Sequence, residues 1–228
     1  MPMELPAAVL FDLDGTLLDS EDLWWDAECR VVSSWGGTWT REDQAHCLGG
    51  PLERVTAYMA QETGCPHSPE RIGEELLAAM EALLREGNLE WRPGGLELLT
   101  ECRAAGVPTA LVSASHRRLL DAVSDAVVDH PGVPDPAFDV TVAGDEVDQG
   151  KPHPEPYLEA ARRLGVPIES CVVIEDSPTG VASGQASGAY VLAVPHLVDI
   201  PPQERRRVVG SLAGVTLDDL RSWASLPG

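Results

Sequence analysis

Short apolar runs alternate with longer segments of helical periodicity along most of the chain. The apolar runs are bounded by polar or turn residues, which is typical of buried β-strands, and they cover residues 7–11, 109–112, 138–142, 171–174 and 189–194. Helical spacing follows over residues 96–105, 117–127, 154–164 and 178–187. Because strands separated by helices form parallel sheets with right-handed crossovers, the pattern predicts a Rossmann-like α/β core with helices on both faces.

One region departs from this alternation. Residues 20–90 contain only helical patterns, over residues 21–35, 52–62 and 69–85, with glycine and proline between them. They predict a small all-helical domain inserted after the first strand, while residues 1–19 and 91–228 form the α/β core. The arginine-rich segment 205–207 is interpreted as the solvated face of a helix.

Charge and cysteine content narrow the range of partners. The chain has 228 residues, with 16 basic and 37 acidic side chains and a net charge of −21, which disfavours nucleic acids and anionic membranes as partners. The sequence has neither a basic leader nor an apolar run of about twenty residues, so neither a signal peptide nor a membrane span is expected. Five scattered cysteines without a C-x-x-C pair are typical of a reducing compartment. We therefore expect a cytoplasmic monomer or small homo-oligomer.

Polar residues that follow the predicted strands are candidates for chemistry, because ligands of parallel sheets bind beyond the carboxyl ends of the strands. Carboxylates from two different loops suit a hard cation with oxygen ligands, Mg²⁺ in the first place. A hydroxyl and an ammonium group suit the oxygens of a phosphoryl group. Six residues provide these groups: Asp12, Asp14, Ser113, Lys151, Glu175 and Asp176. Lys151 is the only lysine of the chain.

Four segments resemble, in order, the four motifs of the haloacid dehalogenase-like superfamily. They are residues 11–21 (FDLDGTLLDSE), 111–115 (LVSAS), 150–154 (GKPHP) and 174–177 (IEDS). Together they extend over nearly the whole chain. The resemblance implies the same fold class as the periodicity does, and it implies a phosphatase as the enzyme class.

The resemblance also implies a role for each motif residue. Asp12 would be the nucleophile that forms an aspartyl-phosphate, and Asp14 would be the general acid and base. Ser113 and Lys151 would bind the phosphoryl oxygens. Mg²⁺ would be held by a set of four residues: Asp12, Asp14 through its carbonyl group, Asp176, and Glu175 through a water molecule.

The helical insert resembles the cap of one branch of the superfamily, a domain that closes over the site and selects the substrate. Substrate contacts are therefore expected from cap residues and from residues of the second motif. The candidates are Glu21, Trp24, His46, Gly50, Ala114, Ser115 and Arg117.

Several activities are known on such a framework. An aspartate at position 14 argues against a true dehalogenase, and an insert without lysine argues against the phosphonate-cleaving relatives. The segment 19–24 resembles sugar and polyol phosphatases, so a small phosphorylated metabolite is the expected partner. A β-phosphoglucomutase-like phosphosugar mutase is the alternative within the family. A catalytically silent binding protein on the same fold is the alternative outside this class.

Overall fold

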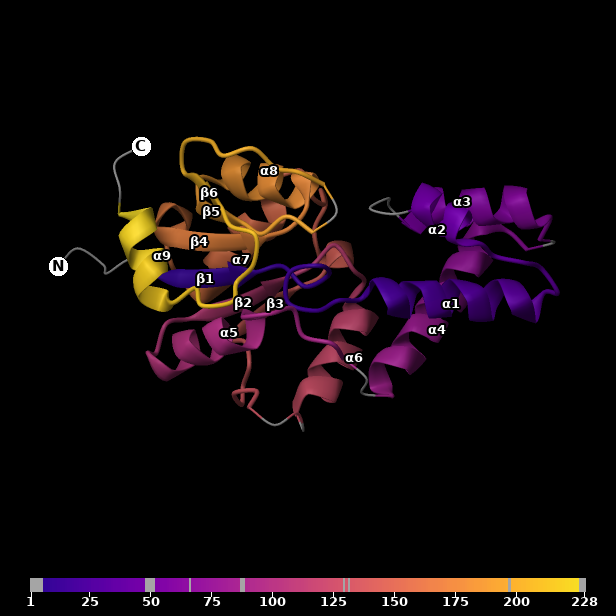
Figure 1. The fold of residues 1–228 in the computed structure, drawn as a ribbon, viewed down its shortest axis with the longest axis horizontal. Coiled ribbons are helices and arrows are strands. Elements are labelled where there is room, and N and C mark those ends of the chain that lie inside the picture. Colours follow the sequence, from indigo (N-terminus) through magenta and orange to yellow (C-terminus); the bar gives the residue numbers. More distant parts are fainter. Residues whose placement is uncertain are drawn as a thin grey trace. The chain divides into compact units, whose positions relative to one another are not determined.

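The computed structural model describes residues 6–47, 52–65, 67–86, 89–128, 130, 132–196 and 198–225. The chain divides into two compact units. Residues 1–19 and 89–228 form the first, which we call the sheet unit, and residues 20–88 form the second, the helical unit (Figure 1).

The sheet unit is built on six parallel strands in the order β3-β2-β1-β4-β5-β6. The strands are β1 (Ala8–Phe11), β2 (Thr109–Val112), β3 (Val140–Val142), β4 (Cys171–Glu175), β5 (Tyr190–Ala193) and β6 (Arg206–Val208). This confirms the predicted fold class and the first five strands. The strand order reverses between β1 and β4, where Phe11 pairs with Ile174. In open α/β sheets this switch point is where ligands bind.

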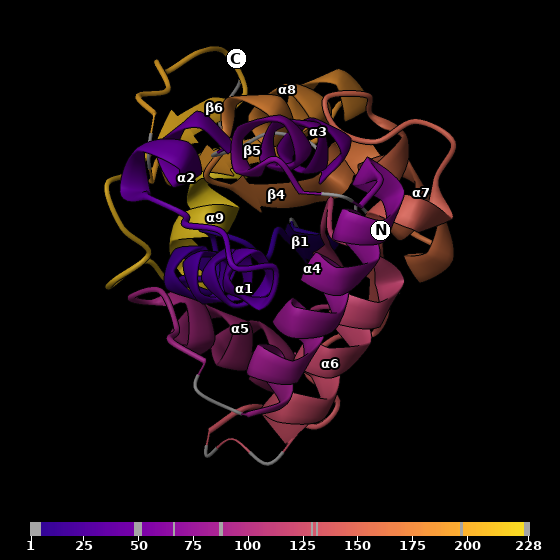
Figure 2. The same cartoon turned by 90° about the vertical axis from the view of Figure 1, so that its right-hand side faces the viewer.

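Helices cover both faces of the sheet. They are α5 (Gly95–Ala104), α6 (Arg117–Val128), α7 (Glu155–Leu164), α8 (Pro178–Ser187) and α9 (Leu217–Ala224), with 3₁₀ turns η1 (Gly144–Glu146) and η2 (Ile168–Ser170). In Figure 2, α8 lies above the strands, whereas α5 and α6 lie below them. Side chains alternate accordingly: Leu10 and Val173 belong to a buried cluster with residues of α7 and α8.

Strand β6 corrects one prediction. Residues 205–207 were expected on a helix, but Arg206–Val208 form an edge strand beside β5. Charged side chains on an edge strand commonly prevent its pairing with other chains. Because of these arginines, the segment lacks the apolar pattern from which strands are predicted. The Arg207 guanidinium lies over the ring of Trp223 on α9, 4.2 Å from its centroid, so this arginine also packs on an aromatic side chain.

The helical unit contains α1 (Glu21–Ser34), α2 (Arg41–Cys47), α3 (Leu52–Thr63) and α4 (Pro69–Arg85). Helix α4 packs against α1 and α3, and α2 contacts α3. The unit has its own core, which includes Val32, Trp39, Met59, Ile72 and Leu76. Ser68 begins α4 as a side-chain cap, because its hydroxyl accepts a hydrogen bond from the Arg71 amide.

Within the described part of the chain, no helix combines the length and the apolar composition that a membrane crossing requires.

Candidate active site

Asp12 and Lys151 form a buried ion pair where β1 meets β4. The Asp12 amide donates to the Ile174 carbonyl at 3.0 Å, which places its side chain directly beyond β1. Lys151 Nζ lies 2.7 Å from Asp12 Oδ1 and 2.6 Å from Glu175 Oε1. It also donates to the Val112 carbonyl at 2.9 Å, so β1, β2 and β4 all contribute to one cluster.

Burial and charge act in opposite directions on these groups. Burial alone disfavours the Lys151 ammonium, but Asp12 and Glu175 outweigh it, and the pKa of Lys151 is raised. The pKa of Asp12 is also raised, chiefly by burial and by the charge of Glu175, despite the opposing effect of Lys151. The single positive charge of Lys151 therefore does not compensate the negative charges of the carboxylates that surround it.

Glu175 is fully buried and accepts five hydrogen bonds from described residues. Oε1 accepts from Lys151 Nζ and, at 2.8 Å, from the Tyr157 hydroxyl. Oε2 accepts from the amides of Asp176 and Ser177 and from the Ser177 hydroxyl, at 3.1 to 3.3 Å. An ideal Cβ on Gly180 would lie 1.7 Å from Oε1, so only glycine allows α8 to approach this carboxylate.

Asp12, Glu175 and Asp176 form a group that could hold a metal ion, since one oxygen of each lies within 4.8 Å of the others. Burial, followed by the charge of Glu175, raises the pKa of Asp176 to about 7. With Lys151 as the neighbouring cation, three carboxylates face one ammonium. When all three are ionised, these oxygen donors carry an excess of two negative charges, which matches the chemistry of a divalent hard cation.

Gly15 lets the chain turn closely around Asp176. Its φ of 82° lies in the left-handed region, and an ideal Cβ would lie 2.3 Å from Asp176 Oδ2. The Thr16 hydroxyl donates to Asp176 Oδ1 at 3.3 Å. The turn after β1 therefore contacts the carboxylate that follows β4.

Asp14 contacts the loop after β2. The hydroxyls of Ser113 and Ser115 both donate to Asp14 Oδ2, at 3.3 and 3.0 Å. The Ser115 amide in turn donates to the Ser113 hydroxyl at 2.9 Å, which fixes both serines in the same turn. The six strand-end candidates thus form two hydrogen-bonded groups at the same edge of the sheet, one around Lys151 and one around Asp14.

The other predicted substrate residues are placed differently. The Arg117 guanidinium donates to Thr141 Oγ1 at 2.8 Å and to Glu146 at 2.5 Å, so it is engaged within the protein and its substrate role stays a prediction. Ala114 is exposed beside the serines. Three candidates lie in the helical unit, namely Glu21 and Trp24 on α1 and His46, which stacks on Tyr58. Gly50 lies outside the described residues.

Sequence reasoning missed Tyr157 and Gly180 as contacts of Glu175. Neither belongs to a strand end, because each lies in the first turn of a helix. Thr16 lies within the first motif, but its contact with Asp176 depends on the fold of the turn. The spacing of polar residues alone carries no signal for these three.

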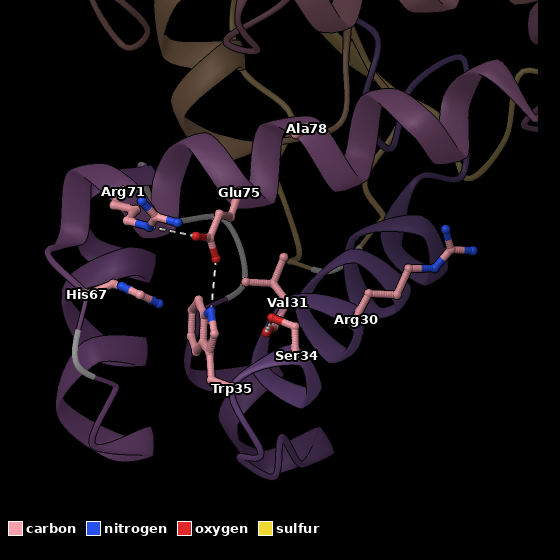
Figure 3. Close-up of a pocket in the computed structure, with 8 residues that line it drawn as sticks. All are labelled: Arg30, Val31, Ser34, Trp35, His67, Arg71, Glu75 and Ala78. Carbon is pink, nitrogen blue, oxygen red and sulfur yellow. Dashed lines mark hydrogen bonds and ion pairs between the residues drawn. The ribbon is translucent and has the colours of Figure 1, made fainter.

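A hollow of about 450 Å³ on the helical unit contains none of these residues. In Figure 3, Trp35 and Arg71 both point toward Glu75. The Trp35 indole and the Arg71 guanidinium donate to the two carboxylate oxygens, each at 2.9 Å. These polar groups already have hydrogen-bond partners in one another. The hollow therefore shows no group of reactive side chains comparable to those around Lys151 and Asp14.

The family model described as haloacid dehalogenase-like hydrolase matches residues 9–194, which contain both groups of candidate residues described above. The chain therefore belongs to this family. The predicted resemblance is confirmed over most of the sequence.

Individual relatives agree with this assignment. Hexitol phosphatase A of Escherichia coli is 35% identical over 213 residues, covering 91% of this chain and 92% of that protein. Protein CbbY of Cereibacter sphaeroides is 33% identical over 195 residues, covering 82% and 84%. The chain also matches a bifunctional riboflavin kinase/FMN phosphatase of Arabidopsis thaliana at 33% identity, but spans only 50% of its length.

A solved structure shows the same fold. The crystal structure of CbbY from Rhodobacter sphaeroides in complex with phosphate superposes with a TM-score of 0.81 at 28% identity, covering 95% of this chain and 99% of that chain. Family, relatives and fold together identify the chain as an enzyme, a phosphatase of the haloacid dehalogenase-like type.

Proposed function

We propose that this chain is a Mg²⁺-dependent phosphomonoesterase for a small sugar or polyol phosphate and that it acts through an aspartyl-phosphate on Asp12. The observation that carries the proposal is the buried contact of 2.7 Å between Lys151 Nζ and Asp12 Oδ1. A carboxylate held beside an ammonium group is a nucleophile that a phosphoryl dianion can approach, because the cation offsets the repulsion between the two anions.

Asp12 attacks the phosphorus atom, and the bond to the leaving oxygen breaks. Lys151 and the Ser113 hydroxyl bind the phosphoryl oxygens during this step, since catalysis of phosphoryl transfer consists mainly of positioning and charge stabilisation. Asp14 gives a proton to the leaving oxygen. It then takes a proton from the water molecule that hydrolyses the aspartyl-phosphate.

The serine pair supports this assignment of Asp14. Both hydroxyls donate to the same oxygen, Oδ2. When Ser113 turns its one hydrogen atom to a bound phosphoryl oxygen, the Ser115 hydroxyl still orients the carboxyl group. A carboxyl group that must donate a proton and later accept one benefits from partners that can rotate their own hydrogen atoms.

Asp12, Glu175 and Asp176 would hold Mg²⁺, because their oxygens are close together and their charge exceeds that of Lys151. When bound, the ion supplies positive charge to the phosphoryl oxygens and to the nucleophile. The hydrogen bonds that saturate Glu175 make Asp12 and Asp176 the stronger candidates for direct contact with it.

The substrate class is supported by the relatives. Besides hexitol phosphatase A, a phosphorylated carbohydrates phosphatase of Thermotoga maritima is 32% identical over 186 residues. A second structure of CbbY, a mutant in complex with xylulose-(1,5)bisphosphate, matches with a TM-score of 0.81 at 28% identity. A small phosphorylated carbohydrate is the ligand chemistry that these proteins share.

The variant Asp12→Asn tests the proposal. It keeps the shape of the side chain but removes the nucleophile, so hydrolysis of a panel of sugar and polyol phosphates should fall by at least about a thousandfold. Activity is measured with and without Mg²⁺. The control Asp218→Asn changes an exposed aspartate of α9, whose side chain is 84% exposed, and should retain full activity. Near-normal turnover by Asp12→Asn would exclude the aspartyl-phosphate.

A phosphosugar mutase is the second candidate. It is favoured by a structure described as a putative β-phosphoglucomutase from Thermotoga maritima, which has a TM-score of 0.69 and 29% identity. Both reactions begin with the same phosphorylated aspartate. They differ in whether water or a second hydroxyl group of the sugar removes the phosphoryl group.

A further inference from the structure

Tyr157 contacts two members of the group around Lys151 although it belongs to none of the four motifs. It lies in the first turn of α7, and its side chain is completely buried. Its hydroxyl donates to Glu175 Oε1 at 2.8 Å, and its ring centroid lies 5.0 Å from Lys151 Nζ. A buried tyrosine usually needs one hydrogen-bond partner, but this one also faces the ammonium group with its ring.

The position of Lys151 depends on how strongly Glu175 attracts it. Asp12 and Glu175 both accept from Nζ, at nearly equal distances of 2.7 and 2.6 Å. Tyr157 donates to the same Oε1 that accepts from Lys151, and so satisfies part of its hydrogen-bonding capacity. Without that hydroxyl, Lys151 alone would compensate the negative charge at Glu175 Oε1. Its ammonium group would then move toward Glu175 and away from Asp12.

Hydrogen bonds to the other oxygen of Glu175 cannot replace the one that Tyr157 donates to Oε1. Oε2 accepts from Asp176 and Ser177, whose backbone is fixed by the start of α8. These contacts hold the carboxylate in place, but they do not change how strongly Oε1 attracts Lys151.

We propose that Tyr157 is a positioning residue, which shares Glu175 with Lys151 and thereby keeps the ammonium group directed at Asp12 and at the bound phosphoryl group. The inference rests on the proposed function, in which Lys151 binds the phosphoryl oxygens. The ring stabilises the charge of Lys151. The hydroxyl determines how close the ammonium group lies to each of the two carboxylates.

The variant Tyr157→Phe tests this, because it removes the hydroxyl and keeps the ring. Binding of inorganic phosphate in the presence of Mg²⁺ is measured by calorimetry, and kcat and KM are measured with p-nitrophenyl phosphate. Loss of one hydrogen bond to a charged group predicts roughly tenfold weaker phosphate binding and a similar loss in kcat/KM. Tyr190→Phe, on β5, is the matched control and should change neither.

A double-mutant cycle separates positioning from packing. If Tyr157 acts through Glu175, then Tyr157→Phe should cause no further loss of phosphate affinity in a Glu175→Gln background. Additive losses would overturn the inference. So would a Tyr157→Phe variant that binds phosphate within about twofold of the wild type and is changed only in its melting temperature.

Failure of the proposed function would look different. In that case the wild type would hydrolyse no phosphate ester, and the activity of Asp12→Asn would be the same as that of the wild type. Calorimetry with inorganic phosphate does not depend on turnover. If the wild type binds phosphate and Tyr157→Phe binds it equally well, the inference is overturned whether or not any ester is hydrolysed.

Discussion

Glu28 is a buried carboxylate with no role in the proposed chemistry. Its side chain is 4% exposed in the helical unit, and the Trp39 indole donates to Oε2 at 2.9 Å. Burial raises the pKa of Glu28 from 4.5 to about 7, although the hydrogen bond from Trp39 and the charge of Arg41 oppose this shift. The folded state therefore binds this proton more tightly than the unfolded chain does.

This shift predicts a loss of stability with rising pH. The contribution of Glu28 is fully present below pH 4.5 and is lost as the pH rises through about 7, because only the unfolded chain ionises without a penalty. Glu28→Gln should therefore be more stable than the wild type at pH 8, by at most about 3 kcal/mol, and nearly equal to it at about pH 4.5. Urea unfolding at both pH values measures this. Glu42→Gln, at an exposed position of α2, is the control and should show no such gain.

Asp14 gives a kinetic prediction at the same scale. If it activates the hydrolytic water, Asp14→Asn should slow the breakdown of the aspartyl-phosphate more than its formation when the leaving group is good. With p-nitrophenyl phosphate, a phosphorylated enzyme should then accumulate and be visible by intact-protein mass spectrometry after rapid quenching. Asp12→Asn should show none. An Asp14→Asn variant that changes only KM would contradict the general acid and base role.

Individual elements show what the sequence could and could not predict. Strands β1 to β5 and the long helices have clear periodicity, and parallel strands bring their carboxyl ends to one edge, so residues such as Asp12 and Asp176 could be grouped beforehand. Strand β6 was missed because Arg206 and Arg207 mask its pattern. Tyr157 could not be assigned to the site, because its contact with Glu175 arises only when α7 packs on the sheet.

A glycine at the start of α5 gives a prediction about packing between elements. Gly94 has a φ of +87°, and an ideal Cβ would lie 2.1 Å from the backbone carbon of Leu212. Gly106, just after α5, has a φ of +69°, but an added Cβ meets nothing within 4 Å among the described residues. Both positions disfavour alanine by about 1 kcal/mol through the left-handed backbone alone.

Gly94→Ala should therefore be the more harmful of the two substitutions. The backbone of Leu212 cannot move as the end of a side chain can, so Gly94→Ala should cost several kcal/mol of unfolding free energy, against about 1 kcal/mol for Gly106→Ala. Urea denaturation followed by circular dichroism compares the two variants. Equal losses would mean that the segment around Leu212 adapts to the added methyl group.

Charge at the scale of the whole molecule gives a prediction about the substrate. The net charge is −21, and the helical unit, residues 20–88, has 13 acidic side chains but only 5 arginines. One of these, Arg54, donates to the Cys47 carbonyl at 3.2 Å. A second phosphate group on the substrate would need a cation of its own, because an unpaired buried charge costs several kcal/mol. If the helical unit contributes to substrate binding, as expected for a cap, we expect monophosphates as substrates and hydrolysis in preference to transfer between two positions of one sugar.

Supplying β-glucose 1-phosphate with a trace of the 1,6-bisphosphate distinguishes the two reactions. Inorganic phosphate and glucose 6-phosphate are followed together over time. If the acidic helical unit offers no anchor for a second phosphate, phosphate release should exceed glucose 6-phosphate formation by at least about tenfold, which corresponds to a difference of about 1.4 kcal/mol between the two barriers. Arg54→Ala should then leave this ratio unchanged. Rapid formation of glucose 6-phosphate with little phosphate release, abolished in Arg54→Ala, would instead show that Arg54 anchors the second phosphate and that the enzyme is a mutase.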